Sequence, residues 1–204
     1  RAFGSTITFF PGVESWFGRI DAYALERGVR VDHHIISSGL REMVEGSAIA
    51  GAFTRIYASG FMYDDEGAAV WPALAVNYTT KTQFLFRINK GSPEVYDNST
   101  INAFIPKDER PLPFANMVYV GDGETDVPCF RLVKKEGGHA IAVYRPERPD
   151  SAALAGRLMD EGRASLAAPA DYSEGSVVDR AVKAIVDRIE ATARISGAIA
   201  EGGE

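Results

Sequence analysis

The chain has 204 residues, with 22 Lys and Arg residues against 28 Asp and Glu residues, and a formal net charge of -6. Its composition, 46% apolar and 25% charged, is that of one folded globular domain and excludes a disordered chain, a coiled coil or a collagen-like fibre. No apolar run is long enough to span a bilayer, so we expect no membrane contact. The mild acidity argues against a nucleic-acid surface, which needs clustered Lys and Arg.

Cysteine usage indicates a compartment. Cys129 is the only cysteine, so the chain cannot form an internal disulfide. We therefore expect a reducing, cytoplasmic location and a thiol that packs as a small apolar side chain. Neither length nor composition indicates an oligomeric state.

The first half of the chain predicts helices that alternate with short strands. Apolar residues at helical spacing begin after Pro11 and end before Gly28, which predicts an amphipathic helix. We expect strands over residues 29–36, 55–58 and 69–71, helices over residues 40–50 and 80–90, and a turn over residues 63–67.

The second half continues this alternation. A long irregular connection is expected over residues 91–114. Strands are predicted over residues 116–120 and 140–143, with a helix between them, and everything after residue 150 is predicted to be helical. Alternating strands and helices predict an α/β fold with a mostly parallel sheet and helices on both faces. Ligands of such sheets bind at the carboxyl ends of the strands.

Three carboxylates lie at the carboxyl end of the predicted strand over residues 116–120. They are Asp122, Glu124 and Asp126, and glycines on either side of Asp122 allow the backbone to turn sharply. Clustered carboxylate oxygens are ligands that suit Mg²⁺. The alternative is a solvated acidic turn whose Asp126 stabilises the start of the next helix.

A pair of serines follows another predicted strand. Ser37, Ser38 and Gly39 precede a predicted helix. Hydroxyl groups and backbone N–H groups at the start of a helix can bind an anion such as phosphate. The alternative is that a serine only caps the helix.

One lysine stands out by its position. Lys81 is expected in the first turn of a helix, where a cation opposes the helix dipole, so it is a candidate partner for a phosphate or carboxylate. The alternative is a lysine that faces solvent. Lys90 lies at the other end of this helix, where a cation is favourable without any function.

These features occur in the same order as the motifs of a known protein family. A strand ending in Ser-x-Gly, a helix-borne lysine and an apolar strand ending in Gly-Asp-Gly-x-x-Asp resemble the second, third and fourth motifs of the haloacid dehalogenase (HAD) superfamily of phosphohydrolases. The resemblance covers residues 11–144. Residues 35–39, which read Ile-Ile-Ser-Ser-Gly, are similar to the phosphoserine-phosphatase-like branch. The resemblance implies a three-layer, Rossmann-like core.

The resemblance also implies how phosphate would be bound. Ser37 would hydrogen-bond the phosphoryl group that is transferred, and Ser38 and Gly39 would supply backbone donors. Lys81 would neutralise the phosphoryl oxygens and an aspartate nucleophile. Positioning and charge neutralisation are what phosphoryl transfer requires of a protein.

The same resemblance implies a metal and a reaction. Asp122 would coordinate Mg²⁺ directly, and Asp126 would bind the metal or its waters. The implied activity is Mg²⁺-dependent hydrolysis of a small phosphorylated metabolite through an aspartyl-phosphate intermediate.

The first motif of that family, a strand followed by Asp-x-Asp, is absent from the chain. Asp64 and Asp65 are adjacent in a turn, Asp32 precedes two histidines, and Asp21 falls on a helix. We therefore expect the nucleophile strand and a cap to lie upstream of Arg1, and the 204 residues alone to be inactive. The alternatives are that a separate chain supplies the nucleophile, or that the protein has lost it.

This interpretation divides the chain into three parts. Residues 1–10 are expected to return from the missing cap, residues 11–150 to form the HAD-like core, and residues 151–204 to form helices that pack on it. Two other functions stay open: a non-catalytic protein that binds phosphate or another ligand, and a phosphotransferase such as a phosphomutase. The residues of the chain do not predict which substrate is bound.

Overall fold

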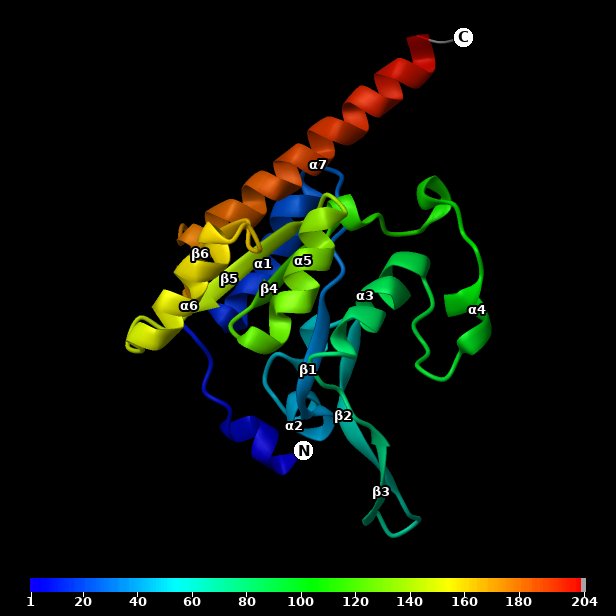
Figure 1. Cartoon of the computed structure of the whole chain (residues 1–204), viewed down its shortest axis with the longest axis vertical. Helices are drawn as coiled ribbons and strands as arrows, with labels where there is room; N and C mark the ends of the chain where they lie inside the picture. Colours follow the sequence, from blue (N-terminus) through cyan, green and yellow to red (C-terminus); the bar gives the residue numbers. More distant parts are fainter. Residues whose placement is uncertain (203–204) are drawn as a thin grey trace.

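The computed structural model describes residues 1–202 as an α/β structure with two small sheets (Figure 1). Strands β1 and β2 are parallel, β3 is antiparallel to β2, and β4, β5 and β6 are all parallel. The first sheet contains β1 (His34–Leu40), β2 (Arg55–Tyr63) and β3 (Ala69–Leu74). The second contains β4 (Val118–Gly121), β5 (His139–Tyr144) and β6 (Leu166–Pro169).

Helices connect and cover these strands. The α-helices are α1 (Val13–Leu25), α2 (Arg41–Glu45), α3 (Lys81–Lys90), α4 (Asn98–Asn102), α5 (Val127–Lys135), α6 (Pro149–Asp160) and α7 (Val177–Gly202). Short 3-10 turns occur at Ala2–Thr6, Ala50–Ala52, Lys107–Glu109, Phe114–Asn116 and Glu124–Asp126. Among the described residues, no helix combines the length and the low polarity that crossing a bilayer requires.

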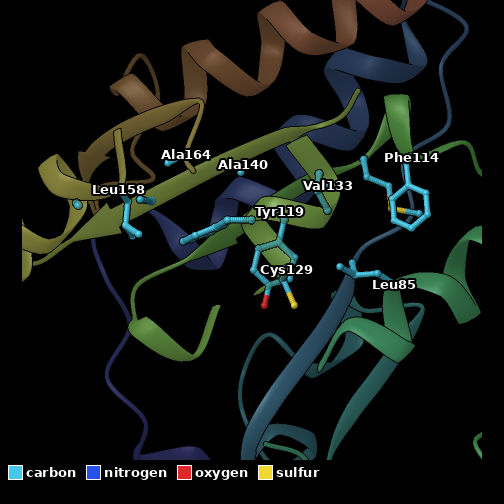
Figure 2. Close-up of a cluster of buried hydrophobic side chains, with 12 residues drawn as sticks. Leu85, Phe114, Tyr119, Cys129, Val133, Ala140, Leu158 and Ala164 are labelled. Carbon is cyan, nitrogen blue, oxygen red and sulfur yellow. The ribbon is translucent and has the colours of Figure 1, made fainter. Parts of the chain in front are cut away.

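The second sheet is covered by helices on both faces, as the alternation of elements predicted. On one face, Ala140 and Ala142 of β5 pack in a cluster with Phe130 of α5 and Leu158 of α6 (Figure 2). On the other face, alternate residues of β5 pack against α1 and α7. The period of two along a strand sends neighbouring side chains to opposite faces, so β5 separates two apolar layers.

Both helix ends marked by glycine are confirmed. Gly28 follows α1 with a φ of 67°, and Gly91 follows α3 with a φ of 65°. This left-handed conformation is one that glycine adopts without steric cost, which explains why each helix stops there.

Several predicted elements are wrong in extent, and β2 and β3 continue to Tyr63 and Leu74 rather than ending at residues 58 and 71. Strand β1 begins at His34 rather than at residue 29, because its partner β2 begins opposite at Arg55. It continues through Leu40, so the helix expected over residues 40–50 shrinks to Arg41–Glu45. The connection over residues 91–114 contains the short helix α4, which Asp97 caps by accepting hydrogen bonds from two backbone N–H groups.

The C-terminal part is not made of helices alone. Strand β6 lies within residues 151–204 and pairs with β5 in the second sheet. Its four residues, Leu-Ala-Ala-Pro, have neither alternation nor β-branched side chains, so sequence periodicity does not detect it. Pairing with an adjacent parallel strand outweighs this weak local preference.

A buried carboxylate joins the first helix to the last. Asp179 of α7 accepts hydrogen bonds from the Gly175 N–H at 2.9 Å and from Arg19 of α1 at 3.4 Å, and its Oδ2 lies 2.9 Å from Nζ of Lys183. Burial alone would raise the pKa of Asp179, but the Gly175 N–H and the two cations outweigh it and hold the pKa below its ordinary value.

We predict that Asp179→Ala lowers the free energy of unfolding by about 3–5 kcal/mol, because it leaves two cations without their buried partner. Since the native pKa is lowered, this contribution is complete above the unfolded-state pKa of about 3.9 and is lost as pH falls through the native pKa. Urea unfolding should therefore show a difference in the free energy of unfolding between the wild type and Asp179→Asn. This difference should become smaller as the pH falls. Asp187→Asn is the matched control on the exposed side of α7, with an expected effect below about 1 kcal/mol. A difference in unfolding free energy that stays constant down to acid pH would contradict the lowered pKa of Asp179.

Candidate functional site

The carboxyl ends of β1 and β4 meet at one cavity of about 1050 Å³. Ser37 of β1 and Asp122, which directly follows β4, both line it. Both residues, predicted to lie at strand ends, therefore line the same cavity. Each of the two strands is apolar where it crosses the core and has polar residues at its carboxyl end. These polar residues therefore lie where each strand leaves the core.

The local structure around the serines differs from the expectation. Ser37, Ser38 and Gly39 lie within β1, and Leu40 precedes the five-residue helix α2 without a side-chain cap. Neither a helix-start anion site nor a serine cap is therefore formed. Instead, the Ser37 hydroxyl oxygen accepts the Gly39 N–H at 3.0 Å, and Ser38 is exposed. The cause is the length of β1, which extends further than the sequence pattern suggests.

Lys81 is buried and paired, so the interpretation as a solvent-facing lysine is wrong. Only 5% of its surface is exposed, and its Nζ donates to Oδ1 of Asp126 at 2.7 Å. A longer contact of 3.5 Å joins Nζ to the Thr125 hydroxyl. Lys90, at the other end of α3, donates to the carbonyl groups of two residues that follow it, which is a structural role.

Asp126 is held from three sides. Its Oδ1 accepts hydrogen bonds from Lys81 and from the Tyr119 hydroxyl, both at 2.7 Å, and its Oδ2 accepts the Gly123 N–H at 3.3 Å. Because Oδ1 already has two donors, only Oδ2 retains a free lone pair. Asp126 is thus first of all the anchor of Lys81, with a secondary capacity for a metal or its water.

Tyr119 was missed by the sequence analysis. Its ring packs against Phe130, and its hydroxyl points in the same direction as the Cys129 thiol (Figure 2). Burial and the Asp126 carboxylate raise the pKa of Tyr119, so the hydroxyl stays protonated and donates. The available signal was a tyrosine between two valines of a buried strand, since a buried phenol needs a hydrogen-bond partner.

Cys129 packs as predicted. The residue is fully buried, and burial raises the pKa of its thiol to about 11. A thiol with so high a pKa is a poor nucleophile at neutral pH.

Close packing explains one glycine of the acidic turn. A Cβ atom on Gly121 would lie 2.7 Å from Cγ and Oδ2 of Asp126. Asp126 can therefore return against the end of β4 only if position 121 carries no side chain. The buried Asp126 carboxylate therefore packs against the end of β4, whereas Asp122 is exposed.

Asp122 is the free carboxylate of the site. It is exposed and, within residues 1–202, forms no ion pair or hydrogen bond with another side chain. Burial and the nearby Asp122 charge raise the pKa of Tyr172 to about 12. Glu124 is also exposed, but it points toward Arg157 at 3.7 Å.

Only a few oxygen atoms of this site are suited to bind Mg²⁺. Within the described part of the chain, no three His, Cys, Asp or Glu side chains are grouped as a metal site. Mg²⁺ commonly binds proteins through one or two carboxylates and keeps several waters. Asp122, with both oxygens free, and Oδ2 of Asp126 are the donors that could hold it.

Lys81 and Ser37 lie on elements that pack in one apolar cluster. Ile36, which precedes Ser37, packs in the same cluster as Leu85, one turn after Lys81, and as Tyr119. The elements that carry the serine, the lysine and the acidic turn therefore pack against one another.

Comparison with known proteins gives one relative of note. The chain is 31% identical over 193 residues to an uncharacterized protein of Borreliella burgdorferi, a match that covers 85% of this chain. The match covers 65% of the length of that protein, so the chain spans less than two thirds of it. No family model matches the chain.

We predict strong coupling between Lys81 and Asp126. Lys81→Met and Asp126→Asn should each cost about 3–5 kcal/mol of unfolding free energy, because each leaves its partner's charge buried and unpaired. The double variant should cost less than the sum of the two, since it leaves neither charge unpaired. Urea unfolding of the four proteins in a double-mutant cycle measures this coupling.

The matched control pairs a lysine and a carboxylate on the surface. Lys107 and Glu136 are joined at 2.9 Å, and the lysine is largely exposed. Their cycle should give a coupling below about 1 kcal/mol. Simple additivity at Lys81 and Asp126 would contradict a buried ion pair.

Proposed function

We propose that this chain carries the phosphate-binding and metal-binding part of a Mg²⁺-dependent phosphomonoester hydrolase of the HAD type. Its substrate would be a small phosphorylated metabolite, hydrolysed through an aspartyl-phosphate. The observation that supports the proposal most is a buried lysine, held by Asp126, at the strand end that also presents the free carboxylate of Asp122.

The lysine is suited to bind a phosphoryl oxygen. An ammonium group has three N–H bonds, and Lys81 directs one to Asp126 and a longer one to Thr125. The third is left for a ligand. The low exposure of this charge strengthens its attraction to an anion, because little water screens it.

Ser37 and Asp122 complete the proposed roles. The Ser37 hydroxyl accepts the Gly39 N–H, so its own proton is free to be donated to a phosphoryl oxygen. Asp122 would hold Mg²⁺, which when bound would neutralise charge on the phosphoryl oxygens. Asp126 keeps Lys81 oriented in place.

The nucleophile is proposed to lie outside these 204 residues. None of their aspartates forms an Asp-x-Asp that follows a strand. The longer polypeptide would then be the active form, and residues 1–204 alone would bind without hydrolysing.

Phosphate release from p-nitrophenyl phosphate tests this function. The complete encoded polypeptide should release phosphate with Mg²⁺ and not with EDTA, whereas residues 1–204 should release none. Asp122→Asn should lower the rate at least about 100-fold, because the metal loses its direct ligand.

Glu124→Gln is the matched control, since it removes a carboxylate from the same turn that the proposal does not use. Its rate should stay within about twofold of the wild type. Activity that persists in EDTA, or full activity of Asp122→Asn, would overturn the proposal. Binding of phosphate without any release by the complete polypeptide would favour a non-catalytic binding protein.

A further inference from the structure

Arg145 is a cation without a protein partner at the edge of the second sheet. It directly follows β5 and is exposed, and within residues 1–202 its guanidinium forms no ion pair or hydrogen bond. Its Cζ lies 5.1 Å from the ring centroid of Phe10, so a cation–π contact holds the group against the body of the protein. An arginine that is held in place and still unpaired is free to bind an anion.

Tyr172 is a second donor without a partner. Its ring packs edge-on against Trp16, with 5.4 Å between the ring centroids, and its hydroxyl forms no hydrogen bond within residues 1–202. The backbone is fixed here, because the Tyr172 N–H donates to the Pro11 carbonyl at 2.8 Å and the Tyr172 carbonyl accepts from Arg19 at 2.6 Å. A half-buried phenol that is fixed in place and lacks a protein acceptor is suited to donate to a ligand.

Both donors lie on the side of the second sheet that faces α1. Val143 of β5 packs in the cluster on this side, and Arg145 continues the alternation two residues later. Phe10 and Tyr172 pack against the same cluster. The segment of residues 10 and 11 joins the two donors, since Phe10 contacts Arg145 and the Pro11 carbonyl accepts the Tyr172 N–H.

Asp122 belongs to this side as well. Val118 and Val120 of β4 pack against the cluster that contains α1, whereas Tyr119 packs in the opposite one, so the alternation directs Asp122 to the side of the two valines. Two observations agree with this placement. Asp122 and Tyr172 line one cavity, and the charge of Asp122 contributes to the raised pKa of Tyr172.

Strand pairing sets the spacing between the carboxylate and the arginine. Gly121 lies opposite Ala142, so Asp122 is one residue beyond a paired position and Arg145 is three residues beyond it on the neighbouring strand. With strands about 4.8 Å apart and a rise of about 3.3 Å per residue, an extension of this pairing would place the two Cα atoms about 8 Å apart. Such a separation suits two charged groups of one small metabolite.

We propose that Arg145 and Tyr172 form an anion subsite beside Asp122, and that the substrate carries a second anionic group in addition to the phosphoryl group that is hydrolysed. The inference rests on the proposed function and names its substrate class, a small phosphorylated metabolite with a carboxylate or a second phosphate. Arg145 would offer this group two parallel N–H donors, and the Tyr172 hydroxyl a third. A neutral group in the same place would gain no charge-assisted hydrogen bond, so the subsite favours the anion.

Matched pairs of substrates test the subsite in the complete encoded polypeptide. 3-Phosphoglycerate and glycerol 3-phosphate differ by a carboxylate, and fructose 1,6-bisphosphate and fructose 1-phosphate differ by a second phosphate. In at least one pair, the member with the second anionic group should have a kcat/KM at least about tenfold higher. The pair that shows this preference identifies the chemistry of the second group.

Variants assign the preference to the two residues. Arg145→Gln should reduce it at least about tenfold, because glutamine can donate a hydrogen bond but carries no charge. Tyr172→Phe should reduce it at least about threefold and leave the urea midpoint unchanged, since the hydroxyl has no partner among the described residues. Arg131→Gln is the matched control, because Arg131 is an exposed arginine of α5 outside the subsite, and its preference should stay within about twofold of the wild type.

A binding measurement separates the subsite from hydrolysis. Titration calorimetry of the complete polypeptide in EDTA, where no hydrolysis is expected, gives the dissociation constants of the same four compounds. In the pair that shows the preference, the compound with the second anionic group should bind at least about tenfold more tightly, and Arg145→Gln should remove this difference.

The outcomes distinguish the subsite from the phosphatase. Phosphate release from p-nitrophenyl phosphate reports the phosphatase alone, because this compound has no second anionic group. Equal kcat/KM or equal affinity within both pairs would overturn the subsite, as would a preference that Arg145→Gln leaves intact. A binding preference that Arg145→Gln abolishes, without release from p-nitrophenyl phosphate, would support the subsite and contradict the phosphatase.

Discussion

The arrangement of the site depends on the buried ion pair between Lys81 and Asp126. This contact ties α3, which packs along β1, to the turn that follows β4, and so it holds the carboxyl ends of the two sheets in one place. Two buried charges are stable only when their remaining bonding capacity is met, and Tyr119, Gly123 and Thr125 meet part of it. The chain thus keeps a cation in a position where little water screens it, which is the condition for strong attraction to an anion.

A second constraint is the space between β1 and β4. Three-layer α/β structures bury their inner strands on both faces, and here the helical layers are in place while two inner edges face a cavity.

Local sequence patterns predicted much of this fold, and long-range pairing decided the rest. The apolar spacing after Pro11, the glycines at 28 and 91 and the acidic turn after β4 are local signals, and the structure confirms the elements that they mark. The extent of β1 and the existence of β6 depend on pairing with distant strands, which local patterns do not encode. The pairing of Lys81 with an anionic group was suggested by its unfavourable place in a helix, whereas the Tyr119 hydrogen bond needed the three-dimensional neighbours.

We propose that Asp122 and the turn around it hold a divalent cation beside a phosphate-binding lysine. Electron paramagnetic resonance of Mn²⁺, a substitute for Mg²⁺, tests this claim on residues 1–204 without any need for the nucleophile. We expect a bound Mn²⁺ signal in the wild type and in Glu124→Gln, and its loss in Asp122→Asn. Equal Mn²⁺ binding by the wild type and Asp122→Asn, or no binding by the wild type, would contradict it.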